Sequence, residues 1–118
     1  MKGFDPATGL GFIQNGDYVE VTLPYARKGG EGVQVGAGLF GVCVVDGASG
    51  DVVNIHRGGV YGLTALSGAS SDAAQGALAY WDNTNRRVTP VSTGNLKIGE
   101  FLVAKTTTQT TAIVLLDG

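Results

Sequence analysis

The chain has 118 residues, with 8 Lys or Arg, 10 Asp or Glu and one His, so its formal net charge at pH 7 is −2. This balance excludes a basic nucleic-acid-binding surface of the usual kind. A hydrophobic share of 43% argues against disorder, and no apolar run approaches the roughly 18 residues of a membrane span. We therefore expect a soluble globular protein that binds neither nucleic acid nor membrane.

Residues 1–10 show neither strand alternation nor helical periodicity. The segment carries Phe4, Pro6 and Leu10 among Gly, Asp and Thr, and it lacks the apolar stretch of a secretory signal. We expect residues 1–10 to form an N-terminal arm that is ordered only when a partner holds it, and residues 11–118 to form one β-barrel-like domain.

From residue 11 onwards, short β-prone runs alternate with turn clusters, which is typical of an all-β barrel or sandwich. Residues 18–23 alternate apolar and polar side chains, as a strand with one solvated side does. Residues 39–45 form an apolar run that we expect to be the most buried strand. The other strands are predicted at 33–35, 52–56, 60–63, 78–81, 86–91, 97–104 and 111–116.

No long helix is predicted anywhere in the chain. Ser71 is a suitable cap for a single helical turn over residues 72–75, and we expect at most this one helical turn. No segment repeats at a fixed period, and no linker separates two halves that each hold a core. The predicted fold class is all-β, as a single small barrel or sandwich-like domain.

Residues 36–41, Gly-Ala-Gly-Leu-Phe-Gly, fit the Gly-x-Gly-x-x-Gly string of nucleotide-binding loops. That string binds phosphates only where a helix N-terminus follows, whereas a β-prone run follows here. We interpret the string as a tight turn and expect no cofactor.

The sequence offers few groups for metal binding or nucleophilic catalysis. His56 is the only histidine and Cys43 the only cysteine, so we expect no metal site. Cys43 lies in the apolar run and is interpreted as a buried hydrophobe rather than a reactive thiol. The acidic residues stand mostly in turns, where side chains such as Asp46 and Asp51 hydrogen-bond the local backbone.

Tyr80 and Trp81 are adjacent on a predicted strand, so one ring is expected to face the core and the other to face outward. The outward ring suits a protein interface and also suits a sugar-binding platform. Of the two, we favour the interface.

Several short motifs, taken together in their order, resemble the small capsid decoration, or cement, proteins of tailed bacteriophages. The resemblance extends from about residue 11 to the C-terminus. Some members of that family have carried a recombinase label, which no nucleotide site in this sequence supports. The motifs are Phe-Ile-Gln-Asn-Gly-Asp at 12–17, Gly-Val at 41–42 and 59–60, Gly76 with Tyr-Trp-Asp at 80–82, Val-Thr at 88–89, Gly-Asn at 94–95 and Ile-Gly at 98–99.

The resemblance implies a non-enzymatic structural protein that binds the outer surface of the assembled head and stabilises the shell. It implies homotrimers at local threefold positions, the major capsid protein as partner, and a place on the virion after assembly in the bacterial cytoplasm. We expect the arm to contact the capsid through Phe4, Pro6, Leu10 and Phe12. In the family the Phe-Ile-Gln motif begins within a few residues of the initiator, whereas residues 2–11 precede it here.

Two other classes of function remain open from the residues alone. A carbohydrate-binding β-sandwich module would use Tyr80 or Trp81 as a stacking surface. An enzyme with paired carboxylates would need a cleft that brings two Asp or Glu side chains together.

Overall fold

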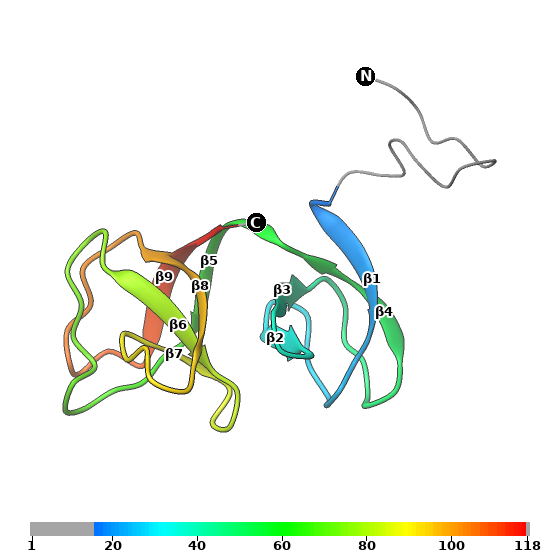
Figure 1. Ribbon diagram of the computed structural model, residues 1–118, viewed down its shortest axis with the longest axis horizontal. Coiled ribbons are helices and arrows are strands. Elements are labelled where there is room, and N and C mark those ends of the chain that lie inside the picture. Colours follow the sequence, from blue (N-terminus) through cyan, green and yellow to red (C-terminus); the bar gives the residue numbers. More distant parts are fainter. Residues whose placement is uncertain (1–15, 118) are drawn as a thin grey trace, which may run out of the picture.

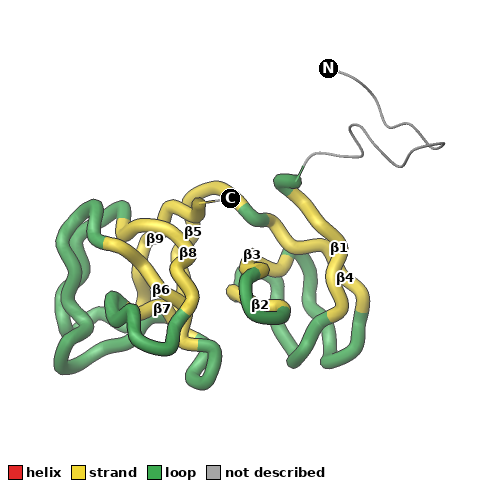
Figure 2. The backbone as a smooth tube through the Cα atoms, viewed as in Figure 1, coloured by secondary structure: helices red, strands yellow, loops and turns green. Residues whose placement is uncertain are grey.

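The computed structural model describes residues 16–117, which form nine β-strands and no helix (Figures 1 and 2). The all-β prediction is confirmed. In this part of the chain no helix has the length and apolar character needed to cross a membrane. The strands are β1 (Tyr18–Thr22), β2 (Gly32–Val35), β3 (Leu39–Cys43), β4 (Val52–His56), β5 (Gly58–Thr64), β6 (Leu78–Asp82), β7 (Arg87–Thr89), β8 (Leu96–Phe101) and β9 (Thr111–Asp117).

The strands form two antiparallel sheets, in the orders β1-β4-β3-β2 and β5-β9-β8-β6-β7. Figure 1 shows the first four strands on one side of the molecule and the last five on the other. Arg57 alone separates β4 from β5. Neither sheet closes on itself, so of the two expected forms, barrel and sandwich-like, the structure fits the sandwich-like one.

Each sheet has its own cluster of buried side chains. Val21, Leu23, Val33, Cys43, Val53 and Ile55 form the cluster of the first half. The larger cluster of the second half is built on Trp81, Phe101 and Val114, which are at most 1% exposed. Two buried clusters in a chain of this length were not expected from the sequence, where no linker marks a division.

Side chains of β3 and β6 join the two halves. The Phe40 ring lies 5.0 Å from the Trp81 ring, centroid to centroid, and belongs to the second cluster although it comes from the first sheet. Gly32 makes this approach possible, because a Cβ on Gly32 would lie 2.8 Å from Phe40 and 3.1 Å from Trp81. The Tyr25 hydroxyl also donates a hydrogen bond to Asn83 Oδ1 at 2.8 Å.

The two halves repeat the same backbone hydrogen-bond pattern, although their sequences show no fixed period. In each half, a glycine that precedes the second strand donates its N–H to the carbonyl of the last residue of a buried strand. An isolated β-bridge joins the two loops near this hydrogen bond. The corresponding bonds are Gly30 N to Cys43 O at 2.8 Å and Gly76 N to Phe101 O at 2.7 Å, and the bridges are Arg27–Gly47 and Ala73–Lys105.

No helical turn forms over residues 72–75, which agrees with the expectation of at most one. Ser71 is fully buried and its hydroxyl donates to Gly68 O at 2.6 Å, within a turn. The Ser71 carbonyl accepts a hydrogen bond from the buried Lys105 ammonium at 3.2 Å. Ser71 therefore serves a buried turn rather than a helix N-terminus.

The buried strand predicted at 39–45 is correct only as far as Cys43, and four of the five residues of β3 are buried. Val44 and Val45 are instead 51% and 52% exposed. The chain leaves the sheet there because Asp46 Oδ1 accepts the Gly29 N–H at 2.8 Å and holds the following loop. Cys43 itself is 2% exposed, as its interpretation as a buried hydrophobe requires.

Candidate functional site

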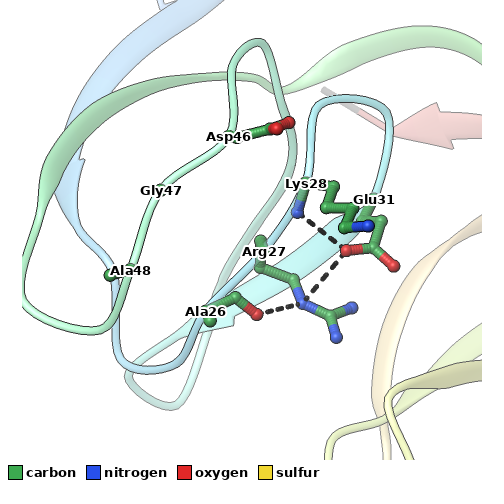
Figure 3. Close-up of a pocket in the computed structure, with 7 residues that line it drawn as sticks. All are labelled: Ala26, Arg27, Lys28, Glu31, Asp46, Gly47 and Ala48. Carbon is green, nitrogen blue, oxygen red and sulfur yellow. Dashed lines mark hydrogen bonds and ion pairs between the residues drawn. The ribbon is translucent and has the colours of Figure 1, made fainter.

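A pocket lies in the first half, between the loop before β2 and the loop after β3 (Figure 3). Its volume is about 480 Å³, and it is open to solvent. It contains two carboxylates, Glu31 and Asp46, from separate loops. The pocket is therefore the place to test the paired-carboxylate hypothesis.

Both carboxylates of the pocket accept hydrogen bonds from backbone amides of the loop before β2. Glu31 accepts the Lys28 N–H at 2.7 Å and lies 3.8 Å from Arg27 Nε, as Figure 3 shows. Asp46 accepts the Gly29 N–H. Carboxylates that accept hydrogen bonds from loop amides in this way stabilise the loops, and this role accounts for both residues. The lining includes no Ser, Cys or His, so no hydroxyl or thiol nucleophile is paired with a histidine base in this pocket.

His56 lies at the junction of the two sheets, stacked on Tyr18 with 4.3 Å between ring centroids. Its Nδ1 and the Tyr61 hydroxyl are hydrogen-bonded, and the Tyr61 ring meets the imidazole edge-on. Burial raises the pKa of Tyr61, with a smaller effect from Tyr18. The histidine is thus a packed structural residue that links β4 to β5. Among residues 16–117 no group of three or more His, Cys, Asp or Glu side chains is placed to hold a metal ion.

The two adjacent aromatics divide as the strand geometry predicts. Trp81 is 1% exposed and packs against Phe40, whereas Tyr80 is half-buried on the opposite side of the sheet. Trp81 is therefore an internal contact, and only Tyr80 has a surface to offer a partner. The predicted arm contacts Phe4, Pro6, Leu10 and Phe12 lie outside the described residues.

The outer side of the second sheet carries a group of exposed apolar side chains that we call the outer face. Ile113 and Leu115 point outward from β9. Val60 lies opposite Leu115 on β5, and the Leu102 amide bonds to Ile113 O. Leu78 of β6 continues the row beyond Glu100. These five side chains are 37% to 51% exposed.

One cation and two anions lie on the outer face. Lys97 Nζ is 2.9 Å from Asp117 Oδ2 and 3.3 Å from Glu100 Oε2. Hydrogen bonds to these carboxylates raise the pKa of Lys97, that to Asp117 most. With one positive and two negative charges, the outer face has a net charge of −1.

Sequence reasoning missed the outer face, although a signal was present. Residues 112–116, Ala-Ile-Val-Leu-Leu, are apolar without interruption, which is typical of a strand that is covered on both sides. In the structure only one side of β9 is covered, by alternate residues. The uninterrupted apolar run therefore indicated that the outward side of β9 is also a contact surface, one that the described residues leave uncovered.

The described residues thus form a small all-β protein with a group of exposed apolar side chains on the outer side of its second sheet. A family model described as "Phage cement protein" matches residues 13–116. The chain belongs to this family. Comparison with curated proteins and with solved structures finds no significant match. Membership gives the protein a structural role at the phage capsid and a place in the virion, as the sequence motifs implied.

Proposed function

We propose that the protein binds the outer surface of the expanded phage head, through contacts with the major capsid protein, and stabilises the shell. The observation that carries the proposal is the family match over residues 13–116. Two packed β-sheets joined by the Phe40–Trp81 contact suit a rigid body that clamps its neighbours. The protein performs no catalysis in this role.

The proposed assembly is a homotrimer at each local threefold position of the head. Three weak contacts on one trimer act together, because docking of one subunit raises the effective concentration of the others, and avidity rises by about 10²- to 10⁴-fold. Residues 1–10, with Phe4, Pro6 and Leu10, and Phe12 beyond them, add a contact that becomes ordered on binding. Assembly takes place in the bacterial cytoplasm.

Co-sedimentation of the purified protein with empty heads of the phage that encodes it tests the proposal. Expanded heads should bind the protein to saturation at three copies per local threefold site, and unexpanded heads should bind none. Absence of binding to both forms would overturn the proposal. A variant that lacks residues 1–10 should remain folded and bind more weakly; unchanged binding would remove the arm from the contact.

A further inference from the structure

We propose that the outer face of the β5-β9-β8-β6 sheet is the surface that docks on the head, against an apolar patch of the shell subunit that carries a positive charge. This inference rests on the proposed function and specifies the contact surface that the proposed function leaves open.

The outer face leaves a large amount of apolar surface in water. Five side chains at 37% to 51% exposure lie on this side of the sheet, on β5, β6 and β9 and directly after β8, with Glu100 between two of them: Val60, Leu78, Leu102, Ile113 and Leu115. Together they expose on the order of 300 Å² of apolar surface, the size of patch that in monomers is often functional. Tyr80, the outward ring of its pair, lies on the same side of β6 as Leu78.

The fold does not require the outer face to be apolar. The amide of Leu102 bonds to Ile113 O in the second half, and the amide of Val44 bonds to Asn54 O in the first. Asn54 therefore occupies in the first sheet the position of Ile113 in the second. Its cross-strand neighbour is Glu20, whereas that of Ile113 is Gly62. The same scaffold position tolerates a polar pair, so a partner rather than the fold accounts for the apolar residues.

The charge and the apolar area of the outer face identify the partner that fits it. A second copy of the same face would place net charge −1 against net charge −1, with Glu100 and Asp117 on both sides. A stable interface between two copies also needs about 800 Å² from each, well above the apolar area of this face. A shell subunit with an apolar patch and a Lys or Arg fits both the charge and the size, since many such contacts act together on one head.

Paired variants test the docking surface. Ile113→Thr with Leu115→Thr removes two apolar side chains of the face and keeps β-forming residues. Val44→Thr with Val45→Thr is the matched control, because these two valines have similar exposure, 51% and 52%, in the other half. In co-sedimentation with empty expanded heads, the first variant should bind about 10- to 100-fold more weakly, and the control within about twofold of the unmodified protein. The reverse order, or equal binding by both variants, would overturn the proposal.

Two further measurements separate the alternatives. Glu100→Lys changes the charge of the face from −1 to +1 and should weaken binding severalfold; tighter binding would contradict a positively charged partner. If sedimentation velocity shows that the double threonine variant has lost a self-association that the unmodified protein shows, the occupant is a second copy. If a hydrophobic dye binds the face only after removal of residues 1–10, the occupant is the chain's own N-terminal segment. A protein that binds no heads in any form refutes the proposed function itself.

Discussion

The two halves of the molecule use one hydrogen-bond scheme for two different purposes. The bridges Arg27–Gly47 and Ala73–Lys105 occupy corresponding places. The first half places Asn54 at the centre of its outer side, and the second places Ile113 there. A backbone pattern can therefore be kept while the side chain at a corresponding outward position changes from polar to apolar. The docking proposal assigns the sheet contact with the head to the second half.

The halves also fill corresponding core positions differently. Cys43 and Phe101 accept equivalent glycine amides and are 2% and 0% exposed. Phe101→Ala removes a whole buried ring and should lower the free energy of unfolding by about 3–5 kcal/mol. Cys43→Ala removes one sulfur atom and should lower it by about 1 kcal/mol. Urea unfolding of the two variants measures both. Equal losses would mean that the two cores are of equal weight and would break the comparison.

A second pair of corresponding residues tests the joint between the halves. Gly32 and Leu78 occupy corresponding positions. The residue before each accepts an equivalent hydrogen bond: the Glu31 carbonyl from the Cys43 amide, and the Ala77 carbonyl from the Phe101 amide. Gly32→Ala forces a methyl group towards Phe40 and Trp81 and should cost about 1–3 kcal/mol. Leu78→Ala acts on a side chain that is 48% exposed and should change stability by no more than about 0.5 kcal/mol. Chemical denaturation gives both values; a tolerated alanine at Gly32 would show that the halves are not held together there.

A further predicted effect is pH-dependent and belongs to the second half alone. Hydrogen bonds from the Asn85 side chain, then from the backbone amides of Asn85 and Thr84, lower the pKa of Asp82 from its usual 3.8, against a raising effect of burial. Because the folded pKa is the lower one, the stabilisation is present above 3.8 and is lost as pH falls through the folded value.

Asp82→Asn should therefore cost about 1 kcal/mol at neutral pH, and the cost should vanish in strong acid. Thermal unfolding at several pH values measures this difference. In the first half, the β2–β3 turn, which contains Gly36, corresponds to the β6–β7 turn. It has no acidic residue, so no carboxylate titrates there, and it serves as the internal control. A difference in stability between the unmodified protein and the Asp82→Asn variant that persists in acid would contradict the assignment of the effect to the carboxylate charge.

Much of the strand pattern could be predicted, because alternation and turn residues are local. Val52–His56 was predicted with its observed bounds. The turn at Ser71 could not be predicted, since its alternative to a helix depends on Lys105, 34 residues away. The repeated hydrogen-bond pattern of the two halves could not be predicted either. It consists of backbone hydrogen bonds, which residues as different as Gly47 and Lys105 form equally well. For the candidate site, the sequence predicted that one ring of the Tyr80–Trp81 pair faces outward, but not which one, nor the apolar neighbours that sheet pairing places beside it.

Hydroxyl-radical footprinting of the protein, free and bound to expanded heads, tests most directly whether the second sheet, rather than the first, docks on the head. Oxidation reports the solvent exposure of individual side chains in both states. The account predicts that Ile113, Leu115 and Leu78 lose most of their labelling on binding, while Val44 and Val45 keep theirs. Protection of Val44 and Val45 with unchanged labelling of Ile113 and Leu115 would contradict it.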